Sequence, residues 1–323
     1  MKPITIGKLR GLQQCTSSRS SPGFGTGRGT FTCLALDHRQ NLRKANPAYQ
    51  DDAELSRFKL DVTAELASSA TCVLLDPEVS AAQAITTGKL PGDKAFVVAV
   101  ESTGYGGEAT ARRGQVIPGW SVEKAKRMGA SMIKLLVYYH PDSPTATEAE
   151  AFTAQIAADC LKSDLGLMLE PLSYSLTDQK LTSDEKRYVV IETARRLTPI
   201  PGVDVLKAEF PLPADSPEPE WPSACAELSA ASVTPWILLS AAVSFETYQR
   251  QIIAACQAGA SGIAVGRAVW QEAVLMNGQA RLDFLRTTAK ERLTRLNALC
   301  TALAKPVTDF YAADAPFDWY KTY

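Results

Sequence analysis

The sequence predicts an α/β protein of the TIM (β/α)8-barrel class, built as a single domain over residues 1–323. Three observations lead to this prediction. Eight short, nearly continuous apolar runs recur along the chain, and stretches with helical periodicity separate most of them. The runs begin roughly 25–40 residues apart, which is the spacing of repeated strand–helix units.

Each apolar run is typical of a parallel strand that is covered on both faces, because it lacks the apolar–polar alternation of a half-exposed sheet. An open doubly wound sheet is the alternative, but it would need a glycine-rich phosphate turn after the first strand, where ALDHRQN stands instead. The predicted strands are 31–37, 72–77, 96–101, 132–139, 166–172, 204–211, 236–242 and 262–268.

Helical periodicity fills the gaps between the strands. Ser121 is the predicted N-cap of one helix. Gly129 and Gly259 each follow a helix and suit a left-handed C-cap. The predicted helices are 52–68, 121–130, 147–164, 183–197, 218–232 and 244–260.

The two ends of the chain lie outside the repeated units. Residues 1–30 form an N-terminal extension, and its Ser/Gly-rich part, 17–30, is predicted to be a loop. The C-terminal closing helix and tail occupy about 281–323, with a long amphipathic helix over 282–303 that closes the barrel. We expect the aromatic tail to dock on the body.

Composition indicates a globular protein of the cytoplasm. The net charge of −1 suggests no nucleic-acid or membrane partner. Seven widely spaced cysteines without a CxxC motif are typical of reduced, buried thiols. The N-terminus lacks the apolar core of a signal peptide, and no run approaches the ~18 apolar residues of a membrane span.

Two lysines interrupt buried strands, Lys207 in DVLKAEFP and Lys134 in MIKLLVYY. A buried lysine is costly unless it is paired or functional. Lys207 could also point outward past a helix. If both amines face the barrel interior, each should lower the pKa of the other, and a neutral amine is what Schiff-base chemistry requires.

Carboxylates stand where several strands end, which is the catalytic end of a TIM barrel. Glu170 closes LMLEPL and could act as a general acid/base or pair with a barrel lysine. Asp37, Asp76 and Glu101 end the first three strands. Each of these three could line the site, or could only cap a turn or neutralise a lysine.

The ends of the last two strands suit an anion. Ser240 and the pair Gly266 and Arg267 stand where many barrels bind phosphate. In the long connection 102–120, Arg112 and Arg113 could close on a second anion or could be a solvated pair. There are only two histidines and no P-loop or dinucleotide fingerprint, so we expect neither a metal nor a cofactor.

Taken together, these strand ends resemble the class I tagatose 1,6-bisphosphate aldolase family, which is related to the aldolase of 6-deoxy-6-sulfofructose 1-phosphate. The resemblance spans about residues 30–275. It rests on the segments ALDHRQ, LLDPE, ESTGY, IKLLVYYHPDS, LEPL, DVLKAEFP, LLSAAVS and VGRAVW, in order. Ala241 and Ala242 stand where relatives tend to have glycine in the second position.

The resemblance implies roles for particular residues. Lys207 would form the Schiff base, Glu170 would transfer protons, and Lys134 and Asp37 would contact the reacting sugar. The phosphate beside the ketone, and the rest of the substrate, would be held by Ser240, Gly266, Arg267, Glu101 and Arg39.

The implied reaction cleaves a ketose 1,6-bisphosphate, such as tagatose 1,6-bisphosphate, to dihydroxyacetone phosphate and glyceraldehyde 3-phosphate. The alternatives are cleavage of 6-deoxy-6-sulfofructose 1-phosphate, giving sulfolactaldehyde, and a sugar-phosphate sensor with little activity. The family also implies a phosphorylated sugar as the only ligand, and a homo-oligomer, dimeric or larger.

Overall fold

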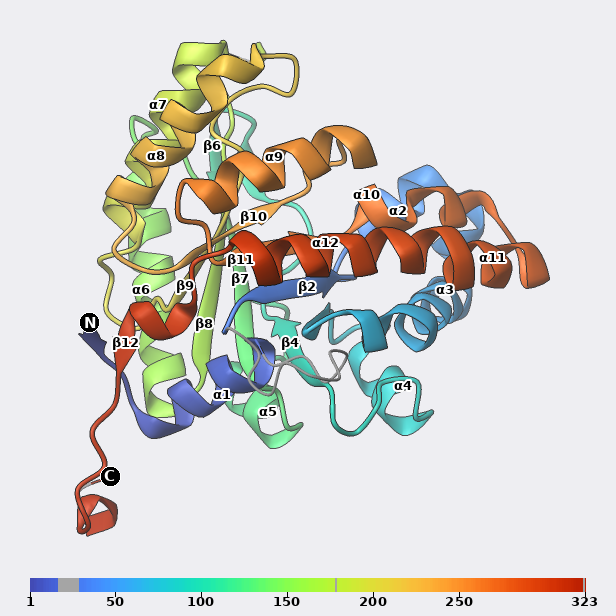
Figure 1. Cartoon of the computed structure of the whole chain (residues 1–323), viewed down its shortest axis with the longest axis horizontal. Coiled ribbons are helices and arrows are strands. Elements are labelled where there is room, and N and C mark those ends of the chain that lie inside the picture. The colour runs from blue at the N-terminus through green and yellow to red at the C-terminus, as the bar shows by residue number, and fades with distance from the viewer. Residues whose placement is uncertain (17–28, 178, 322) are drawn as a thin grey trace.

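Eight parallel strands close into a barrel in the computed structural model, which describes residues 1–16, 29–177, 179–321 and 323. The order around the barrel is β10-β11-β2-β3-β4-β7-β8-β9, and β9 pairs with β10 to close it (Figure 1). The strands are β2 (Phe31–Ala35), β3 (Cys72–Leu75), β4 (Ala95–Ala99), β7 (Met132–Tyr138), β8 (Gly166–Leu172), β9 (Val205–Ala208), β10 (Trp236–Leu239) and β11 (Gly262–Val265).

The predicted fold class is therefore confirmed, and each predicted strand overlaps one barrel strand. The observed strands are mostly shorter at their C-terminal ends than the apolar runs. The prediction 204–211, for example, contains a strand only over Val205–Ala208. Several apolar residues beyond these strands stay buried, Phe210 among them, whereas Ala241 and Ala242 after β10 are not buried.

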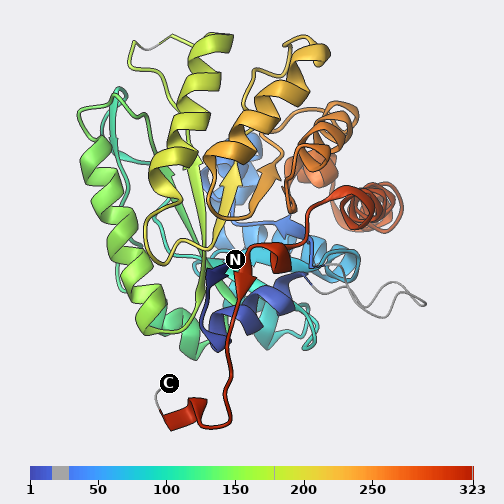
Figure 2. The same cartoon turned by 60° about the vertical axis from the view of Figure 1, so that its left-hand side comes forward.

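Helices surround the barrel (Figures 1 and 2). The predicted N-cap is confirmed, because the Ser121 hydroxyl accepts from the backbone N–H of Lys124. Gly129 and Gly259 have φ of 93° and 110°, as the predicted left-handed C-caps require. The helices between strands are α2 (Gln40–Ala45), α3 (Asp52–Leu66), α4 (Ala81–Thr86), α5 (Val122–Arg127), α6 (Ala146–Lys162), α7 (Ser183–Leu197), α8 (Trp221–Ala231) and α9 (Phe245–Gln257).

The N-terminal extension contains a helix that the sequence prediction missed. Helix α1 (Ile6–Thr16) lies beneath the strands (Figures 1 and 2). Its Leu12 and Cys15 join the buried cluster inside the barrel floor. At Gly11 a β-carbon would lie 2.4 Å from the carbonyl oxygen of Ser131, so glycine allows the close approach. Most of the predicted loop 17–30 lies outside the described residues.

A buried ion pair fixes α1 to the floor. The Lys8 Nζ lies 2.8 Å from Asp204 Oδ2, and the exposed fractions of the two side chains are 2% and 8%. The Asp204 carboxylate also accepts from the backbone N–H of Leu167. Because both charged groups are buried away from water, removing either one would leave the other unpaired and would strongly destabilise the fold.

We therefore predict that Lys8→Met lowers the free energy of unfolding by about 3 to 5 kcal/mol in urea denaturation. The control is Lys162→Met. Lys162 is 80% exposed and lies 3.8 Å from Asp159. That variant should change stability by less than about 0.5 kcal/mol. Equal effects of the two substitutions would contradict the account of the floor.

The C-terminal region packs against the outside of the barrel. Helices α11 (Gly278–Phe284) and α12 (Lys290–Leu303) run on from each other through one π-helical turn, Leu285–Ala289. Beyond them, β12 (Tyr311–Ala312) pairs with β1 (Lys2–Pro3) (Figure 1). The Tyr311 hydroxyl donates to the carbonyl of Asp204. The aromatic tail beyond β12 does not pack on the body as expected, because Phe317, Tyr320 and Tyr323 are exposed; the Tyr323 hydroxyl accepts from the backbone N–H of Gly7 on α1.

Two further predictions, made from the composition of the chain, concern the cysteines and membrane-spanning helices. All seven cysteines are free and buried, as expected for reduced core thiols. Within the described ranges, no helix combines the length and apolarity needed to cross a bilayer.

Candidate active site

A cavity of about 320 Å³ opens at the C-terminal ends of the barrel strands. This is the end at which TIM barrels carry their chemistry. The residues lining it come from most of the strands. The acidic and basic ones are Asp37, His38, Arg39, Glu101, Lys134, Glu170, Lys207, Glu209 and Arg267.

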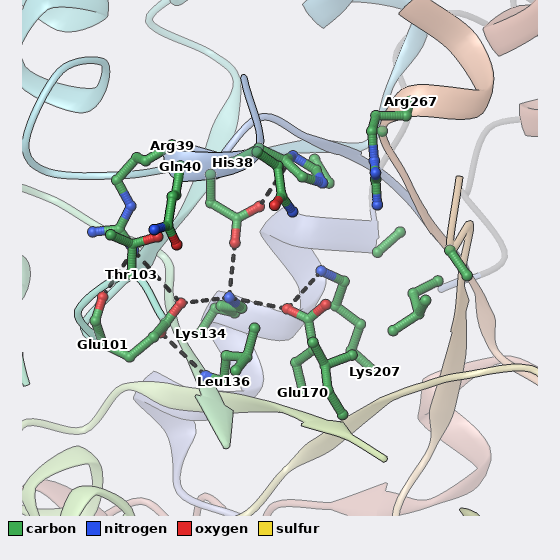
Figure 3. A pocket seen from close by; sticks show the side chains of 18 of the residues that line it. His38, Arg39, Gln40, Glu101, Thr103, Lys134, Leu136, Glu170, Lys207 and Arg267 are labelled. Carbon is green, nitrogen blue, oxygen red and sulfur yellow. Dashed lines mark hydrogen bonds and ion pairs between the residues drawn. The ribbon is translucent and has the colours of Figure 1, made fainter. Parts of the chain in front are cut away.

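The two strand lysines both point into this cavity (Figure 3). On β9, Lys207 alternates with Leu206, which faces the surrounding helices, and shares the inner face with Val205. Lys134 lies on β7, and its exposed fraction is 1%. The outward orientation that was open for Lys207 is not adopted.

Three carboxylates enclose the Lys134 ammonium (Figure 3). Its Nζ lies 2.7 Å from Asp37 Oδ2, 2.5 Å from Glu101 Oε1 and 2.9 Å from Glu170 Oε2. The same Glu170 oxygen lies 2.8 Å from Lys207 Nζ. Glu170 Oε2 therefore forms ion pairs with both lysines and bridges them.

Burial and charge act in opposite directions on these groups. Burial alone would raise the pKa of Asp37, but the charges of Lys134 and Lys207 outweigh it and hold this pKa well below its usual range. The same two lysines lower the pKa of Glu170 against the effect of burial. For Glu101, burial prevails and raises the pKa.

One electrostatic prediction is wrong. The sequence suggests that the two lysines lower each other's pKa. Burial does disfavour the charge on Lys134, but Asp37, Glu101 and Glu170 raise the pKa of Lys134 well above its usual value. Lys134 is thus a fixed cation, and the like-charge argument fails because the sequence does not reveal how many carboxylates surround one amine.

The anion-binding candidates gather on one side of the cavity. Ser240 follows β10, and its hydroxyl accepts weakly from the backbone N–H of Gly266 at 3.4 Å. Arg267 has no carboxylate within 4.0 Å among the described residues, and burial lowers its pKa. Ala241 and Ala242 both adopt left-handed φ, 42° and 61°, which explains why glycine suits this turn.

Of the remaining candidate residues, Arg39 lines the cavity and Asp76 does not. Arg39 is engaged, because it pairs with Glu78 and donates to the carbonyl of Glu101 at 2.9 Å. Asp76 is completely buried, where it pairs with Lys59 and accepts from the Ser80 hydroxyl at 2.6 Å.

The 102–120 connection forms a small hairpin of β5 (Gly106–Glu108) and β6 (Ala111–Arg113). Arg113 pairs with Glu148 on α6 at 2.6 Å. Arg112 packs over the rings of Tyr105, Tyr138 and Tyr174, at 4.4, 5.3 and 4.8 Å from their centroids. Neither arginine lines the cavity, so the idea that they close on an anion finds no support in this structure.

His38 is a cavity residue that the sequence prediction passed over. It follows Asp37 directly and lies between the lysine cluster and Arg267 (Figure 3). Burial lowers the pKa of His38 to about 4, so the ring is neutral at ordinary pH. In the sequence, the tripeptide DHR at 37–39 places a histidine at the end of the first strand, but its neutral state depends on burial, which the sequence does not show.

Comparison with known proteins gives a family match. A family model described as DeoC/LacD family aldolase matches residues 31–272. A tagatose 1,6-diphosphate aldolase of Enterococcus faecalis is 32% identical over 94% of this chain and 96% of its own length. One of Lactococcus lactis is 30% identical over 87% and 94%.

Solved structures show the same fold at greater distance. A fructose-bisphosphate aldolase of Plasmodium falciparum aligns with a TM-score of 0.71 and 14% identity, covering 94% of this chain and 98% of that one. An archaeal fructose 1,6-bisphosphate aldolase aligns with a TM-score of 0.58 and 22% identity over 85% and 95%.

Proposed function

Since the chain belongs to the DeoC/LacD aldolase family, whose members are class I aldolases, we propose that it cleaves a ketose 1,6-bisphosphate through a Schiff base on Lys207. The observation that carries the proposal is the bridge of Glu170 Oε2 between Lys207 and Lys134, at 2.8 and 2.9 Å. In this arrangement the Glu170 carboxylate can accept a proton from the reacting amine of Lys207, and the charged ammonium of Lys134 lies on the other side of that carboxylate.

The first half of the reaction forms the covalent intermediate. Lys207 passes a proton to Glu170, and the neutral amine attacks C2 of the ketose. Glu170 then returns this proton to the former carbonyl oxygen to give the carbinolamine, and carries a second proton from the nitrogen to the hydroxyl group, which leaves as water. The product is an iminium, an electron sink next to the bond that will break. Lys134 remains charged throughout because three carboxylates surround it.

The second half breaks the carbon chain. Glu170 takes the proton of the C4 hydroxyl, the C3–C4 bond cleaves, and its electrons flow into the iminium to give an enamine. The aldehyde leaves. Protonation of the enamine at C3 and hydrolysis of the imine release dihydroxyacetone phosphate and restore Lys207. Asp37 and Lys134 orient the hydroxyl groups during these steps.

Tagatose 1,6-bisphosphate is the first candidate substrate, because tagatose 1,6-diphosphate aldolases are the relatives that match along most of the chain. One observation favours 6-deoxy-6-sulfofructose 1-phosphate as a second candidate. Of the four lysines and arginines lining the cavity, only Arg267 lacks a carboxylate partner among the described residues. The cavity is also lined by the uncharged Gln40, Asn41, Ser102, Thr103 and Gly104, and Arg39 beside them is already paired with Glu78, so the far end suits a sulfonate better than a second phosphate dianion.

The two candidates can be compared in one coupled assay that measures the release of dihydroxyacetone phosphate. We expect turnover with tagatose 1,6-bisphosphate. A kcat/KM at least about tenfold higher for the sulfonate would replace the first candidate with the second. No cleavage of either ketose by folded protein would contradict the proposed function.

Arg267 offers a test of the phosphate end. We predict that Arg267→Met raises the KM for the ketose phosphate by about 10- to 100-fold, because a charge-assisted hydrogen bond to the phosphate is lost. The matched control is Arg250→Met, which removes an exposed arginine paired with Glu218 at 2.8 Å. Steady-state kinetics would contradict the assignment if both variants kept the wild-type KM.

A further inference from the structure

The His38 imidazole is a buried polar group without a partner. Its Nδ1 is inaccessible to solvent and makes no hydrogen bond within the described parts of the chain. The nearest carboxylate oxygen, Asp37 Oδ1, is 4.0 Å away, which is too far for a hydrogen bond. One fifth of the side chain is nevertheless exposed, and the residue lines the cavity. An unsatisfied ring in this position calls for an explanation.

The ring is held against the phosphate end of the cavity. A β-carbon at Gly266 would lie only 2.9 Å from His38 Cε1, so the imidazole packs directly on that glycine. On another side the Trp270 ring meets it edge-on, with centroids 5.5 Å apart and planes at 81°. Gly266 and Arg267 are the residues that the proposed function assigns to the phosphate. His38 is therefore their immediate neighbour.

Charges of both signs surround the ring. Asp37, which precedes it in the chain, and Glu170 on β8 favour a protonated imidazole, whereas Arg267 on α10 (Arg267–Trp270) and Lys207 on β9 oppose it. Burial is the largest influence on the ring, and it keeps the imidazole neutral. An added dianion beside Arg267 would favour the protonated ring.

We propose that His38 binds the substrate phosphate in a proton-coupled manner: the imidazole takes up one proton from solvent when a phosphate enters beside Gly266 and Arg267. The imidazolium then donates from Nε2 to a phosphate oxygen and from Nδ1 toward the Asp37 carboxylate. This inference rests on the proposed function, because that function places the phosphate there.

The proposal predicts how the ring titrates. In the free protein the pKa of His38 is lowered to about 4. A bound dianion within hydrogen-bond distance should raise the measured pKa by about 1 to 3 pH units. Between these two values, binding takes up a proton, so the affinity for a dianion should fall as the pH rises through the bound value.

The chain contains only two histidines, so NMR can follow both rings. The internal control is His140, whose Nδ1 accepts from the backbone N–H of Asp142 and which does not line the cavity. The probe is inorganic sulfate, which stays a dianion across the range. We expect sulfate to raise the pKa of His38 by at least about one pH unit and to leave His140 unchanged.

A second measurement separates this inference from the proposed function. Protein reduced with borohydride in the presence of dihydroxyacetone phosphate carries its phosphate tethered to Lys207. If that adduct forms and neither it nor sulfate moves the pKa of His38, the inference is overturned and the proposed function stands. If no adduct forms and sulfate has no effect, both are overturned.

Kinetics provide an independent readout. His38→Gln keeps a hydrogen-bond donor but cannot titrate. We expect its KM for the ketose phosphate to exceed that of the wild type by about tenfold at pH 6 and to approach it near pH 9, with a smaller effect on kcat. A KM ratio that does not change with pH would indicate a merely structural ring and would overturn the inference.

Discussion

Lys207→Met is expected to reduce cleavage to below about 1% of wild type while leaving the fold intact, because the nucleophile is lost and methionine fills a similar volume. Glu170 keeps an ion-pair partner in this variant, since Lys134 lies 2.9 Å from its Oε2. The thermal unfolding midpoint should therefore stay close to that of the wild type.

The matched control for this variant is Lys186→Met. Lys186 stands at the margin of the site, 3.8 Å from Glu209, and takes no part in the proposed chemistry. It should retain most of the activity. Residual cleavage by Lys207→Met well above 1% in the coupled assay would refute the Schiff-base assignment.

Lys134→Met is expected to have the largest combined effect. The substitution leaves three buried carboxylates, Asp37, Glu101 and Glu170, without the ammonium that they share. We predict a loss of about 3 to 5 kcal/mol in the free energy of unfolding at pH 7. We also predict a fall in kcat/KM of at least about 100-fold, because the fixed charge beside the reacting amine disappears.

The pH dependence of this loss has a defined sign. In the wild type the pKa values of Asp37 and Glu170 are lowered, so these groups stabilise the fold above their unfolded pKa values and lose that effect as the pH falls. Without Lys134, burial and mutual repulsion should raise both values instead. The variant should then be least stable at high pH, and its deficit should shrink toward acid.

Urea denaturation at several pH values measures this trend. The control is Lys59→Met, which breaks a second fully buried pair, with Asp76, outside the cavity. We expect it to lose stability but to keep the Schiff-base chemistry in the folded protein. A Lys134→Met deficit that grows toward acid would contradict the electrostatic account.

The sequence was sufficient to predict the barrel and the residues at its mouth. Buried parallel strands have nearly continuous apolar runs, so the lysines within 132–139 and 204–211 stand out against them. Because the C-terminal ends of the strands converge, Asp37, Glu101 and Glu170 could be expected near these lysines.

Other features depend on tertiary contacts that no local pattern reveals. Helix α1 has a modest apolar face, and only the barrel floor gives it a partner. Asp76 follows its strand in the same way as Asp37, but it forms an ion pair with the buried Lys59 on α3. The neutral state of His38 likewise results from burial among opposing charges, which a tripeptide cannot show.

Reductive trapping can show directly whether Lys207 is the lysine that forms the Schiff base. Folded protein would be incubated with dihydroxyacetone phosphate and borohydride, then weighed intact and after digestion. We expect one stable adduct, on the peptide that carries Lys207, and none in Lys207→Met. An adduct on Lys134, or no adduct on folded protein, would contradict the account, and the second outcome would favour a sugar-phosphate sensor on an aldolase fold.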